Sequence, residues 1–186
     1  MGKKLSESIA EIDAKLHEME KRQDAVLTAS REIIRDCAKA IRFIHTDDLK
    51  SCEKTVSEME KKIIELKKVE KDFEHISQQS YQEIVEIKTL LALFKRKDIP
   101  SMEELKVDYQ AYLSGLADCV GELRRALQLS LRKGKKDDAE YYFEKMNEIY
   151  DNLMILKYSS SLVGPLKRKQ DVLRSQIEQA RSEMLR

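Results

Sequence analysis

The chain has 186 residues, and its 35 basic and 34 acidic side chains leave a formal net charge of only +1 at pH 7. Five glycines, two prolines, no tryptophan and 37% charged residues are typical of a helical protein with long solvated faces. The length suffices for one domain, residues 1–186, with a core of its own. The net charge alone does not indicate a nucleic-acid partner, because only the distribution of charge along the chain can do so.

Signals for strands, membrane spans and disulfides are missing. There is no alternating β-branched run and no Asn-Gly or Asp-Gly hairpin turn. No apolar segment approaches the ~20 residues that cross a bilayer, and no signal-peptide core is present. Cys37, Cys52 and Cys119 lie far apart in helical patterns, which predicts buried reduced thiols. We therefore expect a cytoplasmic protein without a membrane partner.

The first predicted helix, residues 4–44, is unusually long. At about 1.5 Å per residue it would span roughly 60 Å, more than a compact core of this size requires. The surplus length suggests subunits that pack side by side, so we expect a homo-oligomer. A period of 3.6 among its apolar residues predicts one buried face. These residues are Val26, Ile33, Ile34, Cys37, Ile41 and Ile44.

Few breaks interrupt the pattern after the first helix. Polar residues 46–48 predict a helix N-cap, and Ser101 with Glu104 forms a capping box for a single turn after Pro100. The SSSLVGP segment predicts a turn before the last helix. Long helices with short connections predict an all-α, up-and-down bundle. The further helices are expected from the 46–48 cap to about Phe73, over 78–97, over 108–133, from a cap at Asp137 to Tyr158, and over 166–184.

Two pairs of carboxylates stand at helical spacing in two of these helices. Glu83 and Glu86 lie three residues apart in QEIVEIKTLLALF, and Asp118 and Glu122 lie four apart in YLSGLADCVGELRRAL. The first pair is embedded among apolar residues, where an unpaired carboxylate is costly or is forced neutral. Gly115 and Gly121, both in the helix of the second pair, indicate that another backbone or a ligand approaches closely.

Facing acidic pairs on two helices are the way in which helical bundles build metal sites. Carboxylate ligands favour Mg²⁺, with Mn²⁺ as a second candidate, and no zinc or phosphate-loop motif occurs. Such an ion activates water and offsets charge on a phosphodiester. We therefore interpret Glu83, Glu86, Asp118 and Glu122 as the metal ligands and catalytic residues of a nuclease. The alternative is that the first pair lies at the edge of the apolar face and pairs with Lys88 or another base.

A row of basic residues follows the face of the first helix that lies opposite its apolar residues, with His45 at the edge. Such a row can follow a phosphate backbone. Glu32 and Asp36 flank it, so a solvated face of mixed charge is the alternative. Lys157 and the cluster 167–169 would extend the basic surface. The row comprises Arg31, Arg35, Lys39 and Arg42.

Three segments, SREIIRDCAKAIRFIH, QEIVEIKTLLALFKRKDIPSMEEL and DYQAYLSGLADCVGELRRAL, resemble the translin superfamily in this order, and the likeness covers nearly the whole chain. The string YLSG…ADxxGEL is its most specific part. Translin binds single-stranded RNA and DNA but lacks a complete acidic site, whereas Trax has carboxylates that bind Mg²⁺ and cleave RNA. The four acids stand at the Trax positions, so the resemblance implies the Trax-like, catalytic branch.

The resemblance further implies a seven-helix fold and an octameric hollow shell with acidic sites inside. It maps RNA contacts onto Arg31, Arg35 and Lys157. The chain is shorter than eukaryotic members, and its SSSLVGP turn differs from theirs. We expect a Mg²⁺-dependent endoribonuclease acting on single-stranded or short RNA as a homo-octamer, with DNA as a second candidate ligand. The alternatives are a non-catalytic translin-type RNA- and DNA-binding protein, an all-α nucleoside triphosphate pyrophosphohydrolase, and a coiled-coil scaffold.

Overall fold

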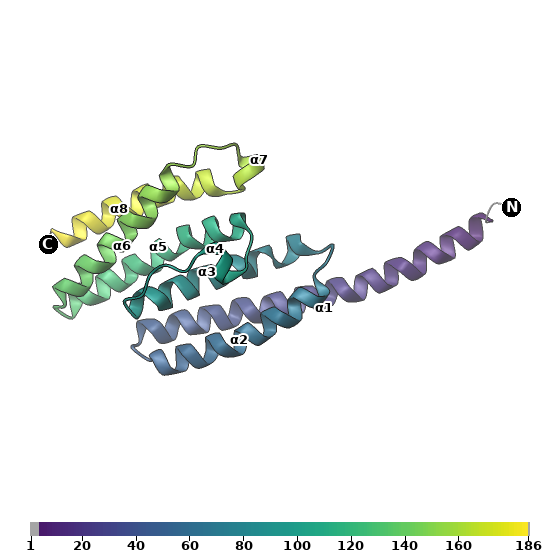
Figure 1. The fold of residues 1–186 in the computed structure, drawn as a ribbon, viewed down its shortest axis with the longest axis horizontal. Coiled ribbons are helices and arrows are strands. Elements are labelled where there is room, and N and C mark those ends of the chain that lie inside the picture. The colour runs from purple at the N-terminus through teal and green to yellow at the C-terminus, as the bar shows by residue number, and fades with distance from the viewer. Residues whose placement is uncertain (1–3, 186) are drawn as a thin grey trace.

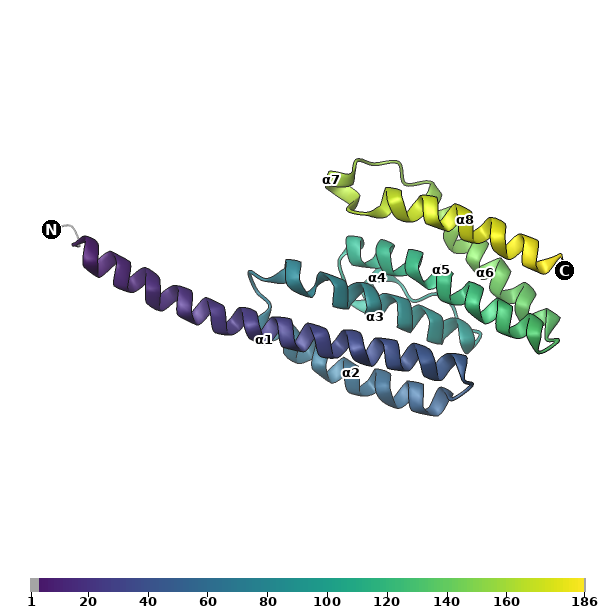
Figure 2. The same cartoon turned by 180° about the vertical axis from the view of Figure 1, so that it is seen from behind.

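The longest helix determines the shape of the molecule. A computed structural model describes residues 4–185, in which α1 (Leu5–His45) runs through the bundle and continues beyond it. The N-terminal half of α1 projects alone, and the chain ends at the opposite end of the molecule (Figures 1 and 2). The C-terminal half of α1 carries the predicted buried face, although Ile34 is only partly buried.

The other long helices are layered on this half of α1. It lies between α2 (Leu49–Val69) and α3 (Glu74–Phe94), and α5 (Tyr109–Arg132) packs on the far side of α3. The described residues 4–185 contain no strand, which confirms the all-α up-and-down bundle. The remaining elements are α6 (Lys136–Met154) and α8 (Leu166–Met184), both packed on α5, and the single turns α4 (Met102–Leu105) and α7 (Ser160–Val163).

One hydrophobic core connects these helices, and large side chains such as Ile33, Leu90, Leu123 and Met146 are fully buried in it. The three cysteines are free and buried, as predicted. Burial raises the pKa of the Cys52 thiol to about 11, so that thiol stays protonated and unreactive near neutral pH. No helix within residues 4–185 is long and apolar enough to cross a bilayer.

Two helix boundaries near residue 70 differ from the prediction. α2 ends at Val69 and not near Phe73, and α3 begins at Glu74 and not at Gln78. The connection is stabilised by tertiary contacts, since the Arg22 guanidinium of α1 donates to the carbonyl of Lys71 at 2.6 Å. The sequence of the connection itself contains no glycine or proline that would have marked it.

The boundaries of α6 also differ from the prediction. α6 starts at Lys136, one residue before the predicted cap, and ends at Met154 and not at Tyr158. Gln170 of α8 donates its side-chain amide to the carbonyls of Leu153 (2.7 Å) and Leu156 (3.0 Å), which satisfies acceptors at the end of the helix. The predicted turn before α8 contains the single helical turn α7.

Candidate metal centre and nucleic-acid interface

Gly115 brings the backbones of α3 and α5 into contact. A Cβ atom at this position would lie 2.4 Å from the carbonyl oxygen of Gln82 and 2.5 Å from Cβ of Val85. No side chain fits at that distance, so the glycine predicted to mark a close approach does so here. The contact places the segment that carries Glu83 and Glu86 directly against the segment that carries Asp118.

The four carboxylates lie near enough to this contact for their charges to act on one another. Glu86 is only 9% exposed. Its pKa is raised to about 8, first by burial and then by the negative charges of Glu83, Asp118 and Glu122. The pKa of Glu83 is also raised, first by burial and then by Asp118. The negative charges of the four predicted acids therefore act on one another across the contact between α3 and α5.

The two acids of α5 have basic partners from distant helices. Lys169 of α8 forms an ion pair with Asp118. His45, at the end of α1, places Nε2 2.5 Å from Oε2 of Glu122, and this hydrogen bond is the main reason that the pKa of Glu122 is lowered. Arg125 lies 3.7 Å from the same carboxylate. Since the imidazole is almost completely buried, it holds Glu122 in a fixed orientation.

The two acids of α3 have no such partners. Lys88, the base that sequence offered for them, is paired with Glu60 of α2 at 2.5 Å, so that alternative is wrong. Within residues 4–185, neither Glu83 nor Glu86 forms an ion pair, and Glu83 accepts a hydrogen bond from Gln79. A buried carboxylate next to three others, without a cation of its own, is an energetically unfavourable arrangement.

The donor set fits a divalent cation by its chemistry. Four carboxylates offer the oxygen ligands that Mg²⁺ and Mn²⁺ prefer, and a bound cation would favour the ionised form of Glu83 and Glu86. Across residues 4–185, however, no three Asp, Glu, His or Cys side chains already stand in a ligand arrangement. Asp118 is turned toward Lys169 and Glu122 toward His45, so an entering ion requires these two carboxylates to rotate.

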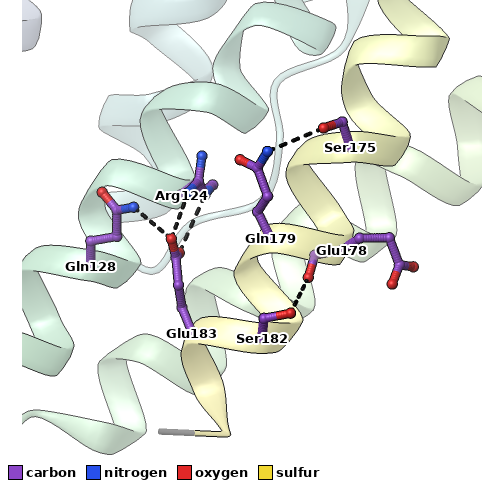
Figure 3. A network of polar contacts seen from close by, with 7 residues as sticks. All are labelled: Arg124, Gln128, Ser175, Glu178, Gln179, Ser182 and Glu183. Atoms are coloured by element: carbon purple, nitrogen blue, oxygen red, sulfur yellow. Dashed lines mark hydrogen bonds and ion pairs between the residues drawn. The ribbon is translucent and has the colours of Figure 1, made fainter.

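A polar network fixes α8 against α5. Glu183 accepts hydrogen bonds from Arg124 (2.5 and 3.2 Å to its two oxygens) and from Gln128 at 2.9 Å (Figure 3). Arginine that donates to both oxygens of a carboxylate restricts both position and angle. The network therefore holds the C-terminal end of α8 against α5.

The basic row of α1 (Arg31, Arg35, Lys39 and Arg42) is exposed along its whole length. Glu32 and Asp36, which the sequence left as its neutralising partners, instead contact Lys62 of α2 at 3.3 and 2.7 Å. No residue of the row forms an ion pair within the described part of the chain. Lys157, just after α6, is exposed as well. The structure therefore contains an uncompensated basic surface and not a face of balanced charge.

The basic row and the acids lie on different sides of α1. Burial, followed by the charges of Glu83 and Glu86, raises the pKa of Cys37, so these acids face the buried side of the helix. The row occupies the opposite, solvated side, and His45 at its edge contacts the acidic site through Glu122. A single subunit thus does not join the two features in one pocket.

A comparison with protein families matches residues 4–182 to the Translin family. The chain belongs to the Translin family. It is 34% identical over 167 residues to the uncharacterized protein MJ0175 of Methanocaldococcus jannaschii, covering 88% of this chain and 75% of that protein.

The fold of this Translin-family protein also matches solved structures. The structure of AfC3PO in complex with duplex RNA has a TM-score of 0.89 and 27% identity, and covers 96% of this chain and 95% of that one. The crystal structure of AfC3PO has a TM-score of 0.88 and 28% identity, with the same coverage of both chains. The crystal structure of apo-NeC3PO has a TM-score of 0.86 and 26% identity, and the match covers 99% of this chain and 98% of that one.

Two residues that contact the candidate site escaped sequence reasoning. His45 and Lys169 contact the α5 acids, yet they lie 77 and 51 residues from them along the chain. The histidine stood only at the edge of the basic row, and the lysine was grouped with a basic surface cluster. No local spacing could have paired either residue with a carboxylate, because both contacts depend on how distant helices pack.

Proposed function

We propose that this Translin-family protein is a Trax-like, metal-dependent endoribonuclease. One observation carries the proposal: Glu86 is buried beside three other carboxylates without an ion pair of its own within residues 4–185. A chain under no chemical demand would place an apolar residue at that position, because burying the acid reduces stability. A divalent cation bound at the site would offset the free-energy cost of burying the ionised Glu86 carboxylate.

The residues of the site divide into three roles. Glu83, Glu86, Asp118 and Glu122 hold Mg²⁺ or Mn²⁺, and His45 orients Glu122 through the hydrogen bond at Nε2. The bound ion supplies a polarised water and neutralises charge on the phosphodiester. Lys169 balances Asp118 while no ion is bound. If an ion were bound by Asp118, the Lys169 ammonium would be free to contact a phosphate.

The substrate is RNA, and the acting unit is a homo-oligomer. The exposed basic row binds phosphates, and a similar protein, AfC3PO, is known in complex with duplex RNA. We therefore extend the expected substrates from single-stranded or short RNA to short duplexes. Since the row and the acids lie on different sides of α1, an RNA strand reaches both most readily when neighbouring subunits combine. A homo-octamer is the assembly that we propose.

Cleavage assays with two variants test the proposal. Labelled RNA is incubated with the wild type, Glu86→Gln and Asp118→Asn, in Mg²⁺ or Mn²⁺. Both variants are expected to lose cleavage by at least about a hundredfold, a loss on the scale of a removed catalytic group, while RNA binding stays within a few-fold. Glu103→Gln, an exposed acid outside the site, is the control and should cut normally. Cleavage that survives in both site variants would show the assignment to be wrong.

A second candidate is RNA binding without cleavage, as in translin. The specific observation in its favour is that Lys169 and His45 already engage two of the four acids. This candidate predicts RNA binding that weakens steeply with salt, but no cutting by the wild type with either ion. Assaying pyrophosphate release from nucleoside triphosphates in the same samples tests the pyrophosphohydrolase alternative.

A further inference from the structure

The N-terminal arm, residues 5–23 of α1, carries a line of large apolar side chains in open solvent. Leu5, Ile9, Ile12 and Leu16 are 78%, 56%, 51% and 57% exposed. The arm projects away from every other helix over most of its length (Figures 1 and 2). Contiguous exposed apolar surface of this kind marks a contact with another molecule.

This line is the continuation of a face that the bundle buries. The buried residues of the other half of α1 include Val26, Ser30, Ile33, Cys37, Ala40 and Ile44, which alternate in steps of four and three. The same alternation extends back through Gln23, Met19 and Leu16 to Leu5 without a break. An average spacing of 3.5 residues between apolar positions is the repeat of coiled coils, in which two helices pack side by side along their length. In the second half α2 and α3 cover the face. In the arm Met19 is partly buried against the core, whereas Leu5, Ile9, Ile12 and Leu16 are exposed.

A notch lies where the arm leaves the bundle. It encloses about 410 Å³, and its lining includes Leu16, Met19, Gln23 and Phe73. Arg22 holds its wall in place, since its guanidinium donates to the carbonyl of Lys71 at 2.6 Å and lies 5.5 Å from the centre of the Phe73 ring. The notch is therefore a fixed, partly apolar recess at one end of the exposed line.

We infer that the arm pairs with the arm of a second copy of this chain in antiparallel orientation. A parallel pair is sterically excluded, because the second copy's residues 26–44 would occupy the space of α2 and α3. An antiparallel pair places the two bundles at opposite ends. In the register that uses the full length of both arms, Leu5 faces Gln23 of the second copy, Ile9 faces its Met19 and Ile12 faces its Leu16.

This register is self-complementary. The apolar layers repeat about a two-fold axis near the middle of the arms, as a closed dimer contact requires. Leu5, the most exposed apolar residue of the arm, then enters the notch beside Phe73 of the second copy. Both ends of the pairing are filled in the same way.

The charges on the flanks of the line predict how salt acts on the pairing. Asp13 and Glu20 stand on one flank, and Lys15 and Arg22 on the other. Antiparallel arms bring like charges together on each flank. Asp13, Lys15 and Glu20 are exposed, Glu20 has His17 within 3.9 Å, and Arg22 already has Asp72 of its own chain at 3.8 Å. Such repulsion is weak and is screened by salt, whereas burial of the apolar line is not. Added salt should therefore strengthen this contact, in contrast to RNA binding.

The inference specifies a contact for the homo-oligomer of the proposed function, and it is independent of the chemistry at the acids. Cysteine cross-linking of the full chain tests it. Leu5→Cys and Gln23→Cys proteins are mixed and oxidised, and only the mixture should form a disulfide-linked dimer. The native cysteines are buried and do not compete. A matched mixture of Glu7→Cys and Lys21→Cys, at the same level on the outer face of the arms, should not link.

Light scattering gives the second measurement. Ile12→Lys with Leu16→Lys should reduce the molar mass of the assembly, and Ala14→Lys, on the opposite face of the arm, should leave it unchanged. RNA cleavage by the wild type is followed in parallel, so that failure of the catalytic proposal is seen separately. The inference is overturned if Leu5→Cys links to itself, if the mixed cysteine variants do not link, or if the Ile12 and Leu16 variant keeps its full mass.

Discussion

The stability of the metal-free protein should decrease as pH rises from 4.5 to 8, because of Glu86. The folded state keeps this carboxyl protonated up to a pKa of about 8, whereas the unfolded chain loses the proton near 4.5. Across that window the native state binds more protons than the unfolded state, so the free energy of unfolding decreases with pH. The pKa of Glu122 is lowered, so its contribution changes only below pH 4.5.

The magnitude follows from the same two values. At about 1.4 kcal/mol per pH unit, a pKa raised from 4.5 to about 8 corresponds to a cost of about 5 kcal/mol for holding Glu86 ionised in the fold. Glu86→Gln keeps the shape and removes the charge. The variant should therefore match the wild type near pH 5 and exceed its stability by several kcal/mol at pH 8.

Urea unfolding at pH 5, 6, 7 and 8 in the presence of a chelator measures this difference at fixed protein concentration, because assembly also contributes to stability. Glu74→Gln, an exposed acid of the same helix, is the control and should follow the wild-type slope. The reasoning fails if Glu86→Gln and the wild type lose stability in parallel across the window, because the carboxyl would then be ionised in the fold at little cost.

Three further outcomes are expected. Gly115→Ala should lower stability by roughly 2–4 kcal/mol in urea unfolding, because the added methyl meets the Gln82 carbonyl, and a change below about 0.5 kcal/mol would contradict the close contact. Lys169→Met should tighten Mn²⁺ binding, measured by electron paramagnetic resonance, by about tenfold or ~1.4 kcal/mol, because Asp118 is released; weaker binding would mean that the lysine supports the ion. Arg35→Ala should weaken RNA binding and reduce the slope of log affinity against log salt by about 0.7 to 0.9, and an unchanged slope would remove it from the interface.

Much of the fold could be predicted because its signals are local. Apolar periodicity gave the long α1, and the last helix was predicted at its observed limits, Leu166–Met184. The single turn with its Ser101 capping box was also predicted correctly. The errors occur at connections such as residues 70–73, where Asp72 adopts a φ of +74° that its residue type does not announce. That connection is shaped by contacts with α1, which no local pattern contains.

The candidate site shows the same contrast between local signals, which the sequence contains, and contacts between distant helices, which it does not. The acids on α3 and α5 could be proposed from the sequence because each pair shares one helix, and Gly115 indicated that another backbone or a ligand lies close to α5. Their basic partners were not found, since His45 and Lys169 reach them from opposite ends of the chain. Conversely, Glu32 seemed from its position to neutralise the basic row. Packing of α2 against α1 gave it Lys62 instead.

The position of Lys62 has a consequence for how this surface could change. A single ammonium group on α2 draws Glu32 and Asp36 aside, so the sign of the electric field above α1 is decided one helix away from the groups that generate it. Replacing that lysine with a neutral residue would return both carboxylates to the neighbourhood of the guanidinium groups. The protein would then weaken its attraction for polyanions without losing any residue that touches them.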